Sequence, residues 1–135
     1  MIDIKKLAEG FDSKSNIKTR TVYLGEEALN VKVNKTISLT DYNTAVTRIQ
    51  EWCFYDDGTG DIVYMPELMH CGLVLECTKV FTNINIEDIS VDEAYVLLCD
   101  INILDLIKTH AESQYKALIK AVKEGVKHRL NIVTA

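Results

Sequence analysis

Apolar and polar residues follow two different periods along this chain of 135 residues. Over residues 29–34, LNVKVN, they alternate with a period of two. That alternation is typical of a strand with one buried face. Residues 21–24 make a shorter candidate strand, and Gly25 lies between the two segments. We therefore expect a β-hairpin with its turn near Gly25.

After residue 37 the apolar residues recur at steps of three and four, which predicts helices. Ser38 and Ser90 are suitable N-caps, with Asp41 and Glu93 three positions later, and Pro66 suits a first helical turn. The first helix is expected to bury Leu39, Tyr42, Val46, Ile49 and Cys53. The last, over residues 111–130, is expected to bury Tyr115, Leu118, Ile119, Val122, Val126 and Leu130.

The helix predicted over residues 66–81 is apolar nearly all round, so we expect it to be central and packed on several sides. The fold class is then mainly α, a helical bundle of about four helices with an N-terminal β-hairpin. We interpret residues 1–135 as a single domain. Because the ends carry few core positions, residues 1–20 are interpreted as a flexible arm and residues 131–135 as a tail. Residues 2–9 could form a short helix within the arm. The alternative is that both ends simply fray.

Composition places the chain among ordinary folded proteins, with 47% apolar and 26% charged residues and a net charge of −5. An acidic chain is not expected to bind nucleic acid. Neither a signal peptide nor an apolar run of roughly 20 residues is found, so we expect no membrane partner and synthesis in a reducing cytoplasm. There, the four cysteines are expected to be buried free thiols.

The stretch MHCGLVLEC, residues 69–77, looks most like chemistry. On a helix Cys71 and Cys77 are separated by a rise of about 9 Å, too far for a disulfide and badly placed for one shared zinc. We favour structural thiols, with His70 hydrogen-bonded at a helix–helix contact. Whether His70 and Glu76 find partners within the chain or across an interface is left open at this point.

No other pattern supports catalysis or metal binding. The DDGTGD segment, residues 56–61, has the wrong acid spacing for an EF-hand and is interpreted as a solvated turn between helices. Phosphate-binding and hydrolase motifs are absent from the sequence. We therefore expect a protein that is not an enzyme, without catalytic residues, cofactor or metal.

Charge is strongly segregated. Residues 49–107 contain twelve acidic residues and one basic residue, Lys79, whereas residues 108–135 contain six basic and two acidic residues. Four lysines, spaced so that they share one side of the last helix, are the candidate interaction residues: Lys116, Lys120, Lys123 and Lys127. They form either a solvated helix face or a contact with an acidic surface of a neighbouring copy or another protein.

The segment VYMPELMHCGLVLECTKVFTNINIED, followed by VDEAYVLLCDINILDLI, resembles a group of small late-region proteins of tailed bacteriophages that infect Gram-positive hosts. The resemblance covers roughly residues 28–130, and its Y/F-T-N-I motif is here Phe81, Thr82, Asn83 and Ile84. The motif is a helix end and a turn, with no catalytic role to transfer. His70 and the cysteines lie outside the pattern.

The resemblance implies a virion structural or assembly protein, capsid-associated or of the neck and connector type, made in the host cytoplasm. Its expected partners are other virion or assembly proteins, and we expect a homo-oligomer or several copies. The hairpin could also add a strand to the sheet edge of a neighbour. A tail assembly chaperone and a small cytoplasmic adaptor or regulatory module are the alternatives.

Reversing Lys116, Lys120, Lys123 and Lys127 to glutamate should leave folding intact and disrupt assembly, because the change inverts the charge of an exposed face without touching the core. Circular dichroism checks the fold, and light scattering checks assembly. Unchanged assembly would mean that the four lysines are only solvated surface.

Overall fold

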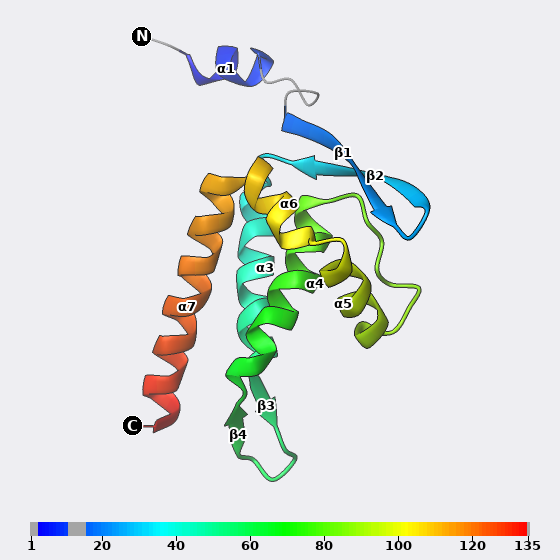
Figure 1. The fold of residues 1–135 in the computed structure, drawn as a ribbon. Coiled ribbons are helices and arrows are strands. Elements are labelled where there is room, and N and C mark those ends of the chain that lie inside the picture. The colour runs from blue at the N-terminus through cyan, green and yellow to red at the C-terminus, as the bar shows by residue number, and fades with distance from the viewer. Residues whose placement is uncertain (1–2, 11–15, 135) are drawn as a thin grey trace.

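A computed structural model describes residues 3–10 and 16–134 of the protein. Within these residues the fold comprises six α-helices and two antiparallel two-stranded sheets (Figure 1). The helices are α1 (Ile4–Gly10), α3 (Leu39–Trp52), α4 (Met69–Phe81), α5 (Val91–Asp100), α6 (Ile103–His110) and α7 (Glu112–Thr134). The strands are β1 (Ile17–Leu24), β2 (Glu27–Asn34), β3 (Phe54–Asp56) and β4 (Ile62–Tyr64), and a 3₁₀ turn, Pro66–Leu68, precedes α4.

The prediction of a mainly helical chain with an N-terminal hairpin is confirmed, but the count of about four helices is wrong. One added helix is α1. The other is α6, which Asn102 separates from α5 by adopting the left-handed conformation (φ 55°, ψ 50°) that asparagine tolerates better than most residues. Of the ends interpreted as an arm and a tail, residues 17–20 lie in β1 and residues 131–134 continue α7. Residues 1–2, 11–15 and 135 are outside the described part of the chain.

The N-terminal hairpin, β1–β2, has the expected turn. Leu24 pairs with Glu27, and Gly25 between them has φ +64°, a conformation that glycine adopts without strain. The alternation in β2 is confirmed, because Val31 and Val33 are buried while Lys32 between them is exposed. A hairpin of two strands is marginal in water on its own, so this burial holds it to the domain.

Helix α4 is central, as its apolar sequence predicts, and packs against α3, α5 and α6 (Figure 1). Gly72 allows α3 to approach closely, because a Cβ at this position would lie 3.0 Å from three atoms of Trp52. On α3, Ile49 is buried as expected, but Leu39 is 73% exposed. That part of the predicted apolar stripe is wrong.

Helix α7 packs along α3 and α6. Of its predicted stripe, Tyr115, Leu118, Val122 and Val126 are buried in the core, whereas Ile119 and Leu130 are half-buried and pack against it. At its first turn, the Gln114 side chain accepts a hydrogen bond from the Ile37 N–H (2.8 Å) and donates one to the Ile37 carbonyl (3.0 Å). This double contact fastens the segment between β2 and α3 to the start of α7.

The DDGTGD segment is a turn, but it joins two short strands and not two helices. Phe54 pairs with Tyr64 and Asp56 with Ile62 to form a second hairpin, β3–β4, which projects from the bundle (Figure 1). The two glycines, Gly58 and Gly60, have φ values of +84° and +90°. Three residues on either side of a polar turn give no clear period, which is why the sequence pattern does not reveal these strands.

Two sets of hydrogen bonds attach the N-terminal hairpin to the helices. The Lys32 N–H donates to Oδ1 of Asn83 (2.9 Å), and the Asn83 N–H donates to the Lys32 carbonyl (3.2 Å). Beside them Val33 and Thr82 form an antiparallel bridge. On β1, Nε of Arg20 donates to Nε2 of His110, at the end of α6 (2.8 Å). The F-T-N-I motif is thus the point where β2 pairs with the end of α4.

Replacing Asn83 with alanine should lower the free energy of unfolding by about 1 kcal/mol, because the Lys32 N–H loses its acceptor while the other bonds remain. Urea denaturation measures the change. Asn43→Ala, on the exposed face of α3, is the matched control and should stay within about 0.5 kcal/mol of the wild type. Equal effects of the two substitutions would contradict a specific role for Asn83 in holding the hairpin.

Candidate functional site: an apolar groove beside the N-terminal hairpin

A groove of about 340 Å³ lies between the N-terminal hairpin, the connection from α4 to α5, and α5 itself. Its walls are almost wholly apolar. The lining residues include Leu29 and Val31 from β2, Ile84 and Ile86 from the connection, Leu97 from α5 and Ile101 at the C-cap of α5. Its volume is at the small end of the range that ligand sites in proteins occupy.

Local sequence explains how each wall forms. In α5 the Ser90 side chain accepts from the Glu93 N–H (3.2 Å), as the predicted N-cap does, so the helix begins at Val91. Leu97 and Ile101 are four residues apart and therefore face the groove from the same side. In the connection, the Ile84 N–H donates to Oγ1 of Thr82 (3.2 Å), a short turn that directs this apolar wall back toward β2.

Each of the three segments that line the groove also carries acidic residues. They are all exposed and lie within two residues of a lining residue in the sequence: Glu26 and Glu27 at the hairpin turn, Glu87 and Asp88 in the connection, and Asp92 and Glu93 at the start of α5. We call these six residues the acidic rim. Lys32 of β2 is the nearest base along these segments. Apolar walls with an acidic rim suit an apolar segment that carries basic residues on its flanks.

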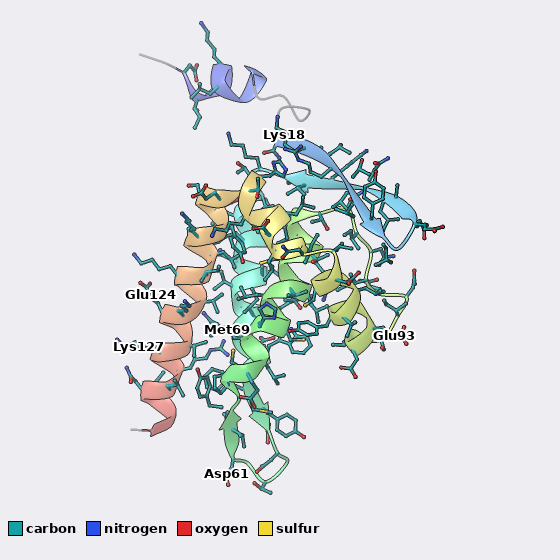
Figure 2. All side chains as sticks on the ribbon, in the orientation of Figure 1. Lys18, Asp61, Met69, Glu93, Glu124 and Lys127 are labelled. Carbon is teal, nitrogen blue, oxygen red and sulfur yellow. The ribbon has the colours of Figure 1, made fainter. Side chains whose placement is uncertain are left out.

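The four lysines predicted to make contacts are all exposed on α7, but the fold does not bring them to the groove. Figure 2 shows Lys127 and Glu124 of α7 on one side of the molecule and Glu93 of the acidic rim on the opposite side. Lys116 is 2.6 Å from Glu112, and this contact holds the pKa of the Glu112 carboxyl below its ordinary value. We call Lys116, Lys120, Lys123 and Lys127 the lysine stripe.

The cysteines have no common role in the structure. Cys53 and Cys77 are buried, and burial raises the pKa of the Cys77 thiol to about 12. Cys71 is half-buried and Cys99 of α5 is exposed, so the expectation that all four are buried is wrong for Cys99. Among the described residues, no group of three histidine, cysteine or acidic side chains is placed to hold a metal ion.

The two polar residues left open by the sequence find partners within the chain. Nδ1 of His70 is 2.7 Å from the Tyr95 hydroxyl, at the contact between α4 and α5, as predicted. Glu76 is buried, and its Oε1 accepts from Nε1 of Trp52 (3.4 Å) and lies 3.2 Å from Nζ of Lys79. The carboxylate is thus satisfied without a second chain.

The two outer edges of the N-terminal hairpin differ: the edge of β2 is hydrogen-bonded to Asn83, and the edge of β1 has no neighbouring strand among the described residues. The Lys35 N–H bonds to the Asn16 carbonyl, and this register turns the backbone of alternate β1 residues, among them Thr19 and Thr21, outward. On the β2 side the outward residue Lys32 is paired with Asn83. Within the described residues no strand pairs with the outer edge of β1, so this edge is where the hairpin could pair with a strand of a neighbouring chain.

Sequence reasoning missed the groove because its walls come from three separate segments. One local signal was present in NINIED, a segment expected to be a loop. Ile84 and Ile86 alternate there with asparagines, and apolar residues at alternate positions of a loop indicate that one side of it packs against something. Comparisons with protein-family models, with curated proteins and with solved structures find no match for the chain. No helix in the described part of the chain has the length and apolar character needed to cross a membrane.

The Arg20–His110 bond should make the hairpin attachment sensitive to pH. Burial, followed by the charges of Arg20 and Lys18, lowers the pKa of His110 below the ordinary value of 6.5, and Nε2 accepts from Arg20 only when the ring is neutral. As pH falls through 6.5 the unfolded chain takes up this proton first, so the stabilising contribution, complete above 6.5, is lost.

Urea denaturation at about pH 7.5 and about pH 5.5 measures this loss. The control is His110→Gln, whose side-chain oxygen accepts from Arg20 at both pH values. The wild type should lose more stability on acidification than the variant does. The same loss in both proteins would rule out His110 as the cause.

Proposed function

We propose that this chain is a non-enzymatic assembly protein of a bacteriophage virion, of the capsid-associated or connector type, and that it acts by binding other proteins. The observation that carries the proposal is the groove, which presents apolar walls and an acidic rim at the surface. A partner segment would bury apolar side chains against Leu29, Ile86 and Leu97, and each large apolar side chain fully buried is worth about 1.5–3 kcal/mol.

Other surface features support a binding role over a role in chemistry. Large apolar side chains are exposed beyond the groove, including Tyr55 and Ile62 on the β3–β4 hairpin. Polar rims around apolar surface are typical of protein interfaces. The lysine stripe adds a second charged surface on the far side of the molecule, where it could meet an acidic neighbour.

Leu97→Asp tests the proposal in a tailed phage that encodes the chain. Leu97 is 41% exposed and lines the groove, so a carboxylate there places a charge in the apolar contact. The amount of the chain in gradient-purified particles should fall about tenfold or more, since losing one buried leucine already costs that factor in affinity. Quantitative mass spectrometry of the particles measures it.

Val96→Asp is the matched control. Val96 is the preceding residue of α5, is 64% exposed and does not line the groove, so this variant adds the same charge to the same helix. It should be incorporated like the wild type. Two results together would overturn the proposal: particles that form normally when the gene is deleted, and wild-type particles that contain none of the gene product.

A further inference from the structure

Helix α1 exposes two large apolar side chains. Ile4 is 77% exposed and Leu7 is 61% exposed, and a spacing of three residues places them on one side of the helix. Lys5 and Lys6 between them are exposed as well. Figure 1 shows α1 standing apart from the helical bundle, beyond the open end of the N-terminal hairpin.

A helix this short needs a surface to pack on. Isolated helices of fewer than about 12 residues are marginal in water, and α1 has seven. The bonds at its start are local: the Lys5 N–H donates to Oδ1 of Asp3 (3.0 Å), and the Lys6 N–H donates to the Asp3 carbonyl (3.0 Å). Such bonds fix where the helix begins but bury no apolar surface. The stability of α1 must therefore come from docking.

The groove and α1 are complementary. The groove offers apolar walls open to solvent, and α1 offers two branched aliphatic side chains on one face. The acidic rim belongs to the same three segments that line the groove, and Lys5 and Lys6 are the residues that follow Ile4 on α1. A short amphipathic helix laid into an apolar groove is a common mode of protein recognition.

We propose that α1 of one copy of this chain docks into the groove of a second copy, with Ile4 and Leu7 against the apolar walls and the two lysines toward the acidic rim. A second copy is favoured over the same chain. The groove is lined by Leu24 and Leu29 near the turn of the hairpin, whereas α1 lies beyond the opposite, open end, away from the groove of its own chain. This inference rests on the proposed function, in that it names the partner that the same groove receives.

Two groups of full-length variants test the arrangement. Groove variants, Leu97→Asp and separately Ile89→Asp, keep α1 intact; Ile89 also lines the groove and is 42% exposed, so each substitution is at the surface. The arm variant, Ile4→Asp with Leu7→Asp, keeps the groove intact. Sedimentation velocity over a wide range of concentration should give association for the wild type and for Val96→Asp. Association should weaken about tenfold or more for the groove and arm variants.

Mixing the variants gives the decisive result. At a concentration where a groove variant and the arm variant are each monomeric alone, a mixture of the two still contains one intact α1 and one intact groove. An equal mixture should therefore form a dimer with one copy of each, which native mass spectrometry identifies when one variant carries an isotopic label. A mixture that stays monomeric, or a wild type that is monomeric throughout, would overturn the proposal.

The same variants separate this inference from the proposed function. If the arm variant enters phage particles as the wild type does while Leu97→Asp does not, the groove binds another virion protein and only the self-docking of α1 is wrong. If none of the substitutions changes incorporation or particle yield, the groove itself has no role in assembly. The expected result is loss of both self-association and incorporation in both groups.

Discussion

The pairing of β2 with the end of α4 is the contact on which the rest of the surface depends. Lys32 and Asn83 exchange two hydrogen bonds, and the burial of Val31 and Val33 accompanies them. This contact turns a hairpin that would be marginal alone into a fixed wall. It also sets the path of the chain after Asn83, which forms the second wall. The motif FTNI therefore has a structural explanation that requires no ligand.

Within the domain the corresponding constraint is the crossing of α3 and α4. The stretch MHCGLVLEC first suggests chemistry through its cysteines, yet its glycine has the larger structural consequence. Gly72 leaves room for Trp52, and the indole Nε1 then reaches Oε1 of Glu76 one turn further along α4. A close approach and a buried carboxylate are thus linked, because the tryptophan that needs the space also donates a hydrogen bond to the carboxylate, whose charge Lys79 balances.

Periodic features of the sequence predicted the fold well. The Ser38 and Ser90 caps, the Gly25 turn and the central position of α4 are local or follow from one helix alone. The break at Asn102 and the short β3–β4 strands were missed, because a single left-handed residue and three-residue strands leave no period to detect. The groove was missed for another reason: its walls meet only after β2 docks, which no pattern within one segment encodes.

The lysine stripe of α7 and Glu93 of the acidic rim lie on opposite sides of the molecule, so opposite charges are presented in different directions. A charged partner that approaches in solution therefore meets a different electrostatic field on each side of the molecule. Such steering favours alignment before contact and acts over roughly 8 Å at physiological ionic strength. Added salt shortens that range, so the rate of productive encounter with a charged partner depends on the solvent as well as on the shapes of the two surfaces.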